Sequence, residues 1–464
     1  MKRNKREACI QEGGVGGRMF VGSGYGVYSK GGVLYVDTFT AYHLNILEIP
    51  DDINDLYITS SRNPGIINYY GGGAEIGAAH QLGRHLDVHY LPAHIPGDNS
   101  SGDGMRLTMQ HFTLNNYSLW LPNDCRIRRD GLEELYKKAE AGDTLLTVGT
   151  FDVSDQKFHE PDKDIPYGIF IFNHDPEIIQ EPEVIGIKEK PTPKKMETEG
   201  HPIKQANTAI YVTTPEFFNR LNNISLSGDV GGVFLPRFIK QHPGKVGWKE
   251  IDYRDVGQPA FHLASALSEF NSDTMSPQFA AHLDRTCRSF DKGDTTVFIR
   301  GKRDNTFSGE MAQQVESRIK RGEIIVEGDF VYFGKEIIIE NGGTFSNAII
   351  GSHSVSGKNV EVIGSNLAPQ VGIGDGSRVI SSGVYLGAKI GANATLNQSY
   401  IGREAEVRPG VQLENYYIDL HTLVEDDHLA SPGTPVPQRT VWGLSKFMVE
   451  QTGRNIDDLL ADMS

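Results

Sequence analysis

The fold of the second half of the chain follows from two stretches, Ile390-Gly-Ala-Asn-Ala-Thr-Leu396 and Ile401-Gly-Arg-Glu-Ala-Glu-Val407-Arg-Pro-Gly-Val-Gln-Leu413. In both stretches an aliphatic residue returns every six positions, and a glycine follows the first of them. A six-residue period fits a short strand and a turn, and three such units close a triangular coil with a continuous aliphatic core. Glycine is expected at the turn where a side chain would collide with the next coil.

Looser copies of the repeat precede these two stretches, at Ile350-Gly351, Ile363-Gly364, Val371-Gly-Ile-Gly374 and Leu386-Gly387. The pattern resembles the hexapeptide-repeat family, which implies a left-handed parallel β-helix over residues 301–430. A glycine-rich β-sandwich is the alternative. If the period is right, two aliphatic series should point inward: Val384, Ile390 and Leu396, and then Ile401, Val407 and Leu413.

The first part of the chain alternates predicted strands and helices. Apolar stretches predict strands at 56–59, 117–121, 143–150, 167–172, 184–187 and 208–212. Helices are predicted at 38–47, 131–141 and 259–270. This alternation indicates a Rossmann-like α/β sheet with both faces covered.

The domain organisation that follows has four parts. Residues 1–265 form the α/β domain, 266–300 a helical linker and 301–430 the β-helix. Residues 431–464 hold a Pro-rich linker and a terminal helix over 444–460. Two or three compact domains are expected for a chain of 464 residues.

Composition excludes several classes of function. The chain is 38% hydrophobic, carries a net charge of −15 and has no basic tract, so nucleic acid is not an expected partner. No apolar run approaches the ~18 residues of a membrane span, and the basic start lacks a secretory apolar stretch, which predicts a cytoplasmic protein. Three scattered cysteines argue against a zinc site and against a disulfide framework.

Five short motifs follow one another in the predicted α/β domain. They are Gly13-Gly14-Val-Gly16-Gly-Arg18, Asn123-Asp124, Tyr167-Gly168, Glu189-Lys190-Pro191 with Asn207-Thr-Ala-Ile-Tyr211, and Tyr253-Arg-Asp255. Singly, each has an ordinary structural explanation: a tight turn, a turn-forming aspartate or a solvated lysine. Backbone N–H groups of a glycine loop approach phosphate closely, and carboxylates suit Mg²⁺.

In this order the motifs resemble the nucleotidyltransferases that join a nucleoside triphosphate to a sugar 1-phosphate, across roughly residues 8–265. The resemblance implies catalytic Arg18, Lys30 and Lys190, and a Mg²⁺ ion held by Asp124 and Asp255. It implies two binding groups, one for nucleotide at Gly13, Gly14, Gly16, Gly102 and Gly104, and one for sugar phosphate at Gly168, Glu189, Lys190 and Asn207. It also implies homo-oligomers assembled through the β-helix.

Several residues depart from the family pattern. Gly17 stands in place of threonine, Ser101-Gly-Asp-Gly-Met105 replaces the usual base-reading loop, and Lys30 takes the place of a Pro-Lys pair. Ala209 stands where glycine is usual, and Tyr253 where tryptophan is usual. These departures favour a second hypothesis, a regulatory or scaffold homologue without turnover. A third hypothesis is an acyltransferase activity in the β-helix, for which His353 is the candidate base.

Overall fold

The computed structural model describes residues 6–12, 33–60, 87–92, 105, 116–154, 160–179, 181–220, 230–301, 307–425 and 439–441. By their contacts, the described residues divide into two compact units. The first comprises residues 6–12 and 45–254, and the second comprises residues 33–44 and 255–441. The sequence prediction drew one continuous domain over 1–265, whereas residues 33–44 group with the second unit.

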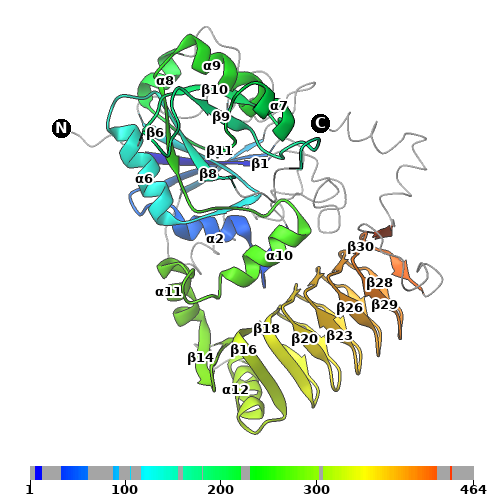
Figure 1. Cartoon of the computed structure of the whole chain (residues 1–464). Coiled ribbons are helices and arrows are strands. Elements are labelled where there is room, and N and C mark those ends of the chain that lie inside the picture. Colours follow the sequence, from blue (N-terminus) through cyan, green and yellow to red (C-terminus); the bar gives the residue numbers. More distant parts are fainter. Residues whose placement is uncertain are drawn as a thin grey trace. The chain divides into compact units, whose positions relative to one another are not determined.

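The first unit is built on a Rossmann-like mixed sheet of nine strands with helices on both faces (Figure 1). Along the sheet the strand order is β10-β9-β11-β6-β1-β4-β5, and β8 pairs with both β11 and β12. The strands are β1 Arg6–Glu12, β4 Asp55–Ser60, β5 Asp87–Pro92, β6 Tyr117–Pro122, β8 Leu146–Asp152, β9 Ile169–Phe172, β10 Val184–Lys188, β11 Gln205–Thr213 and β12 Val246–Glu250. Strands β4, β1 and β6 are parallel neighbours, and β11 runs antiparallel to β6.

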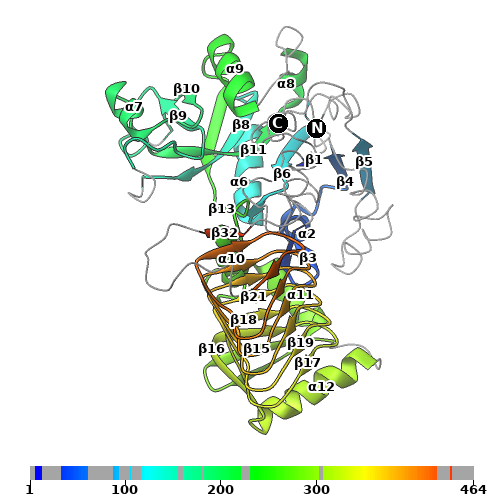
Figure 2. The same ribbon diagram turned by 90° about the vertical axis from the view of Figure 1, so that its right-hand side faces the viewer.

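Short elements complete this unit. Its helices are α6 Arg129–Glu140, α7 Pro193–Thr198, α8 Pro215–Arg220, η5 Val230–Phe234 and α9 Leu235–Gln241, and the second half of α2 Ala41–Glu48 belongs to it. Helix α6 buries Leu132, Leu135, Tyr136 and Ala139 against the sheet, which is the i, i+3, i+4, i+7 spacing of one helix face. Strands β9 and β10 lie with α7 at one end of the sheet (Figure 2).

The second unit contains a stack of parallel strands over residues 324–425, which we call the coil stack (Figure 1). From Val355 to Val407 each strand pairs with the third strand after it, so that equivalent residues are 17 positions apart, as in Ser365 and Ser382. Such a progression of parallel strands is compatible with a β-helix. The left-handed sense of the coil stays a prediction.

The strands of the coil stack form three rows, which begin after β16 Ile324–Phe333. The first row is β18 Gly343–Ile350, β20 Glu361–Ile363, β23 Arg378–Ile380, β26 Thr395–Asn397 and β29 Gln412–Glu414. The second is β21 Asn366–Leu367, β24 Gly383–Val384, β27 Tyr400–Ile401, β30 Tyr416–Ile418 and, beyond the stack, β32 Arg439–Val441. The third is β17 Ile338–Ile339, β19 Val355–Ser356, β22 Gly372–Ile373, β25 Lys389–Ile390, β28 Glu406–Val407 and β31 Leu423–Val424.

The two aliphatic series predicted to point inward are buried in one core, which confirms that part of the prediction. All six residues are at most 3% exposed: Val384, Ile390, Leu396, Ile401, Val407 and Leu413. The six-residue step holds within each series, and a five-residue step from Leu396 to Ile401 joins the two series. The five-residue steps at 362–367, 379–384 and 396–401 each contain a buried serine, Ser365, Ser382 or Ser399. Ser382 Oγ donates to Ile380 O and accepts from Ser399 N one coil later.

Glycines after the aliphatic residues lie where the sequence predicted a collision. A β-carbon at Gly391 would be 2.4 Å from Pro409 N, and one at Gly351 would be 2.5 Å from the carbonyl carbon of Ala368. These neighbours are backbone atoms of the adjacent coil and cannot rotate away. Glycine is therefore required at these positions to let the coils stack at strand spacing.

Other elements of the second unit precede the coil stack. They are the hairpin β2 Leu34–Val36 and β3 Phe39–Thr40, the helices α10 Pro259–Ser268, α11 Pro277–Thr286 and α12 Phe307–Lys320, and the hairpin β14 Cys287–Lys292 and β15 Thr295–Arg300. The expected helical linker over 266–300 therefore ends at Thr286 and continues as a hairpin. Alternating β-branched and aromatic residues in Thr295–Arg300 explain the strand.

A buried polar network ties the 33–44 segment to the coil stack. Asp37 is 1% exposed, and its carboxylate accepts hydrogen bonds from Arg300 Nη1 at 2.5 Å and Tyr332 OH at 3.1 Å. It also accepts from Ser352 N and Oγ, at 2.5 and 2.9 Å. Asn366 Nδ2 donates to Tyr35 O at 2.7 Å. The segment is thus part of the second unit's interior.

Candidate functional site

The carboxyl ends of the parallel strands in the first unit share one edge of the sheet. Strand β1 runs parallel to β6, with Gln11 opposite Pro122, and parallel to β4 on its other side. The turn that holds Asp124 directly follows β6, so Asp124 belongs to this edge. In open sheets of this kind, ligands bind outside the carboxyl ends of the strands. We therefore take this edge as the candidate site.

The predicted nucleotide-binding loops cannot be placed at this edge. Their residues lie outside the described part of the chain: Gly13, Gly14, Gly16, Arg18, Lys30, Gly102 and Gly104. The assignment of the five glycines to nucleotide binding, and of Arg18 and Lys30 to catalysis, stays a prediction.

Three of the four predicted sugar-phosphate residues form one group. Asn207 lies opposite Thr150, near the carboxyl end of β8, and its backbone N donates to Gly168 O at 2.8 Å. A β-carbon at Gly168 would lie 2.8 Å from Glu189 Oε2, so this carboxylate rests against the glycine backbone. The antiparallel pairing of β9 with β10 and β11 brings these distant sequence positions together.

Lys190 directly follows this group and has an unusual backbone conformation. Its φ is 42°, in the left-handed region that a side chain disfavours. Its side chain is 62% exposed, and Nζ lies 4.0 Å from Glu189 Oε1. Strand β10 ends at Lys188, before Pro191, as expected from a proline that cannot continue the ladder. An exposed ammonium beside the group is available to an anionic ligand.

Asn207 shapes a bulge in β11. Pairing with β8 is irregular between Asn207 and Tyr211, and Ala209 in the bulge has a φ of 58°. Asn207 Oδ1 accepts from Ala209 N at 3.0 Å, while Nδ2 donates to Tyr211 OH at 3.1 Å. Thr208 Oγ1 donates to Gly149 O at 2.7 Å. The amide of Asn207 therefore holds the bulge, and Ala209 has a left-handed conformation that glycine would adopt without strain.

Of the two predicted metal residues, Asp124 lies in a turn and Asp255 ends a strand that pairs with the strand after this turn. Asp124 precedes β7 Cys125–Ile127, and Asp255 is the last residue of β13 Tyr253–Asp255, which pairs with β7 in a two-stranded sheet. Asp255 Oδ1 accepts from Gly257 N at 2.7 Å, a turn-forming contact. Convergence of the two carboxylates on one ion stays a prediction.

The donor set can be compared with the needs of Mg²⁺. The described residues include no group of three or more His, Cys, Asp or Glu side chains placed to hold a metal. Mg²⁺ is commonly held through one or two carboxylates together with substrate phosphates and water. A pair of aspartates is thus a sufficient protein contribution, and its oxygen donors suit this hard cation.

Sequence reasoning missed the residues that hold the Asp124 turn. Asn45 and Arg126 are 1% and 3% exposed and belong to α2 and β7. The available signal was Asn45 itself, a polar residue among the apolar neighbours Leu44, Ile46 and Leu47 in a predicted helix. A buried polar residue requires partners, which points to a specific contact.

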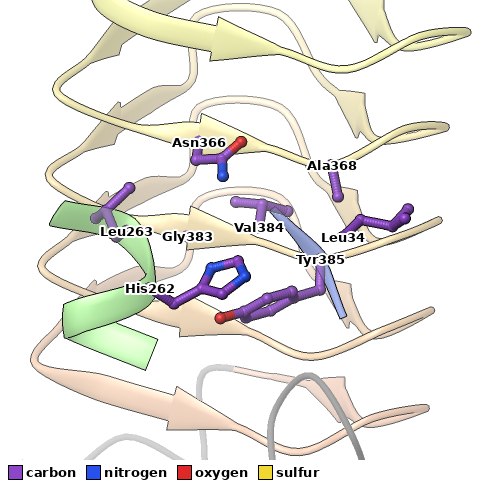
Figure 3. A pocket seen from close by; sticks show the side chains of 8 residues that line it. All are labelled: Leu34, His262, Leu263, Asn366, Ala368, Gly383, Val384 and Tyr385. Carbon is purple, nitrogen blue, oxygen red and sulfur yellow. The ribbon is translucent and has the colours of Figure 1, made fainter. Parts of the chain in front are cut away.

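A pocket in the second unit does not fit a nucleotide (Figure 3). Its cavity volume is about 10 Å³, which is room for about one water molecule and far below the ~300–1,000 Å³ of typical small-molecule sites. His262 faces Tyr385 in this pocket, and its Nε2 has no hydrogen-bond partner among the residues that the structure describes. Burial lowers the pKa of His262 to about 3, so the ring is neutral. The lining is otherwise mainly apolar, from Leu34, Leu263, Asn366, Ala368, Gly383 and Val384.

His353, the candidate acyltransferase base, lies at a turn of the coil stack. Its φ is 61°, its side chain is 51% exposed, and Nδ1 lies 3.4 Å from Glu336 Oε2. A carboxylate partner can orient an imidazole, but this contact alone defines no acyl-binding site.

Among the described residues, no helix has the length and apolar character needed to cross a membrane. Comparison of the sequence with protein-family models finds no match, and comparison with curated proteins finds none either.

Proposed function

We propose that the chain is a Mg²⁺-dependent nucleotidyltransferase that joins a nucleoside triphosphate to a sugar 1-phosphate and releases pyrophosphate. The observation that carries this proposal is the group of Gly168, Glu189 and Asn207, with Lys190 beside it, at the ligand-binding edge of a Rossmann-like sheet. These positions come from three separate stretches of sequence, at Gly168, at Glu189-Lys190 and at Asn207, and they lie together. The motif order described above supplies the reaction class.

The reaction requires a phosphate oxygen of the sugar 1-phosphate to attack the α-phosphorus of the triphosphate, while the bond to pyrophosphate breaks. Both reactants are anions, so the site must supply positive charge and orientation. In this proposal Lys190 binds the sugar 1-phosphate, and Arg18 and Lys30 bind the leaving pyrophosphate. Asp124 and Asp255 hold Mg²⁺, which when bound neutralises charge on the phosphates.

The sugar side of the site follows from the geometry of Glu189. A carboxylate accepts hydrogen bonds from sugar hydroxyls, and Gly168 leaves the space in which this carboxylate rests. Gly13, Gly14, Gly16, Gly102 and Gly104 would approach the nucleotide through backbone N–H groups. The second unit would be a left-handed β-helix that assembles homo-oligomers, in a cytoplasmic protein without nucleic-acid partners.

A regulatory or scaffold role is the second candidate. It is favoured by Ala209, whose left-handed backbone keeps a strain that glycine would remove. Such a homologue would bind nucleotide without releasing pyrophosphate. Acyl transfer at His353 is a third proposal, testable by assaying acyl-thioester consumption.

The test is pyrophosphate release across several triphosphate and sugar 1-phosphate pairs with Mg²⁺. Lys190→Ala should raise the KM for sugar 1-phosphate by roughly tenfold to a thousandfold, as expected for loss of one charge-assisted contact. The KM for nucleotide should change much less. Lys194→Ala is the matched control, because Lys194 is similarly exposed and pairs with Asp162 at 3.2 Å. If no substrate pair releases pyrophosphate although the chain still binds nucleotide, the scaffold role is favoured.

A further inference from the structure

The turn that holds Asp124 is fixed by the side-chain amide of Asn45, which makes the hydrogen bonds that a neighbouring strand would make to β7. Asn45 projects from α2 onto β7, where its Nδ2 donates to Cys125 O at 2.8 Å. Its Oδ1 accepts from Ile127 N at 3.2 Å. These are the carbonyl and N–H groups that a strand would bond on that side of β7. The other side of β7 pairs with β13, so β7 is bonded along both edges.

A buried ion pair fixes Asn45 in turn. Arg126 Nη1 donates to Asn45 Oδ1 at 3.1 Å, and Arg126 Nη2 lies 3.2 Å from Glu48 Oε1. The Arg126 and Glu48 side chains are 3% and 0% exposed. The second oxygen of Glu48 accepts from Arg129 N at 3.1 Å, at the first residue of α6. One carboxylate therefore connects α2, β7 and the start of α6.

The chain is also fixed on the other side of Asp124. Cys125 Sγ donates to Pro122 O at 3.4 Å, which closes the turn between β6 and β7. Asn123, in the turn, is 4% exposed. The backbone on both sides of Asp124 is consequently held by buried contacts. A buried ion pair such as Arg126 with Glu48 adds little stability compared with apolar packing, so this pair is better explained by the position that it fixes.

We infer that Asn45, Glu48 and Arg126 are positioning residues that hold the Asp124 carboxylate in place for a divalent cation. This inference rests on the proposed function, because it takes Asp124 as a metal ligand. Groups that orient a metal ligand act on the affinity of the metal, since a displaced carboxylate loses its coordination geometry.

The test compares two changes of a carboxylate to an amide. Glu48→Gln alters the buried pair with Arg126, whereas Asp51→Asn alters the pair of Asp51 with Arg129, in which Asp51 is 80% exposed. Binding of Mn²⁺ alone to the whole chain is followed by the EPR signal of the free ion. Pyrophosphate release is measured against Mg²⁺ concentration, and thermal unfolding reports stability.

Glu48→Gln should weaken Mn²⁺ binding and raise the Mg²⁺ requirement by roughly tenfold, the lower end of the effect of losing an outer contact of a metal ligand, because Glu48 acts on the Asp124 turn only through Arg126 and Asn45. The KM for sugar 1-phosphate should stay within about twofold, and Asp51→Asn should match the wild type. Asp124→Asn should abolish the site. If Glu48→Gln fails to fold, Arg126→Lys replaces it, because lysine keeps the charge but cannot bridge Asn45 and Glu48 together.

The outcomes separate the inference from the proposed function. Wild-type Mn²⁺ affinity in folded Glu48→Gln or Arg126→Lys would overturn the inference, as would absence of Mn²⁺ binding by the wild type. A lowered melting temperature with an unchanged Mg²⁺ requirement would likewise reduce the network to a structural role and overturn it. Absence of pyrophosphate release from the wild type would overturn the proposed function alone, and Mn²⁺ binding would still decide the inference.

Discussion

At the scale of single residues, Ala209 combines an unfavourable conformation with a position beside the candidate site. With a φ of 58° it occupies the left-handed region, which costs an L-residue roughly 1–2 kcal/mol. Ala209→Gly should therefore stabilise the first unit by roughly 0.5–1 kcal/mol after the greater entropy of the unfolded glycine is deducted. Urea unfolding followed by tryptophan fluorescence measures the change.

Ala141 is the matched control for this substitution. It is exposed at the end of α6 with an ordinary φ of −61°, so Ala141→Gly should destabilise the unit slightly. Equal effects of the two glycines would show that the strain at Ala209 is not expressed in stability.

Two buried histidines make the second unit sensitive to acid. Burial lowers the pKa of His262 to about 3, and burial together with Arg300 and Arg285 lowers that of His282 to about 4. Below about pH 6.5 both histidines bind protons in the unfolded chain but stay neutral in the folded unit. The free energy of unfolding therefore falls as the pH drops towards the folded-state pKa values. The limiting slope is roughly 1.4 kcal/mol per pH unit for each histidine. His262→Phe should flatten the curve in urea unfolding measured between about pH 7 and 4.5, and an unchanged slope would contradict this account.

Part of the site could be predicted at this scale, and part could not. Gly168, Glu189 and Asn207 lie together, and their role in binding sugar phosphate stays a prediction. The support given by Asn45 and Arg126 depends on which helix face meets which strand. A single sequence contains no information on that pairing beyond the presence of a polar residue in an apolar helix.

At the scale of elements, the repeat predicted the parallel coils but not their length. Aliphatic residues are visible in the sequence, whereas three of the five-residue steps hold the buried serines Ser365, Ser382 and Ser399, which are all 0% exposed. Each hydroxyl accepts a backbone N–H from the next coil. Serine is a polar residue that usually faces solvent, so the sequence gives no indication that these serines lie inside the coil stack.

Two glycines of the coil stack should respond differently to alanine. At Gly391 a β-carbon would lie 2.4 Å from Pro409 N, so Gly391→Ala should cost roughly 3 kcal/mol by overpacking against backbone. Gly410 has a φ of 81° and open space around it, so Gly410→Ala should cost only about 1–2 kcal/mol. Thermal unfolding followed by circular dichroism compares them, and a smaller loss at Gly391 would show that the coils can separate at this turn.

At the scale of the whole molecule, the second unit is discontinuous in sequence. Residues 33–44 are tied to the coil stack through Asp37, and Tyr35 OH lies 2.5 Å from Ser265 Oγ. The sequence could not show this grouping, because the segment reads as an ordinary strand-and-helix start of the α/β domain. The grouping depends on Asp37, which is buried by contacts with residues far away in the sequence.

Removing the partner of Asp37 should destabilise the second unit strongly. Arg300→Ala leaves a buried carboxylate unpaired, for which a loss of roughly 3–5 kcal/mol is expected. Arg378→Ala is the control, since Arg378 pairs with Glu361 at 2.6 Å but is 52% exposed, and should cost less than about 1 kcal/mol. Urea unfolding measures both variants. Similar losses in the two would mean that the Asp37 network contributes no more than a surface pair.

The same discontinuity has a consequence for how the chain folds as the ribosome makes it. Asp37 and Ser352 are 315 positions apart. At a synthesis rate of roughly 5–20 residues per second, Ser352 is therefore made about 15–60 s after Asp37. During that interval the nascent 33–44 segment exposes Tyr35 and Phe39, which are at most 4% exposed once folded. Chaperones that bind apolar segments would thus meet this one early, and release from them would coincide with emergence of the first coils.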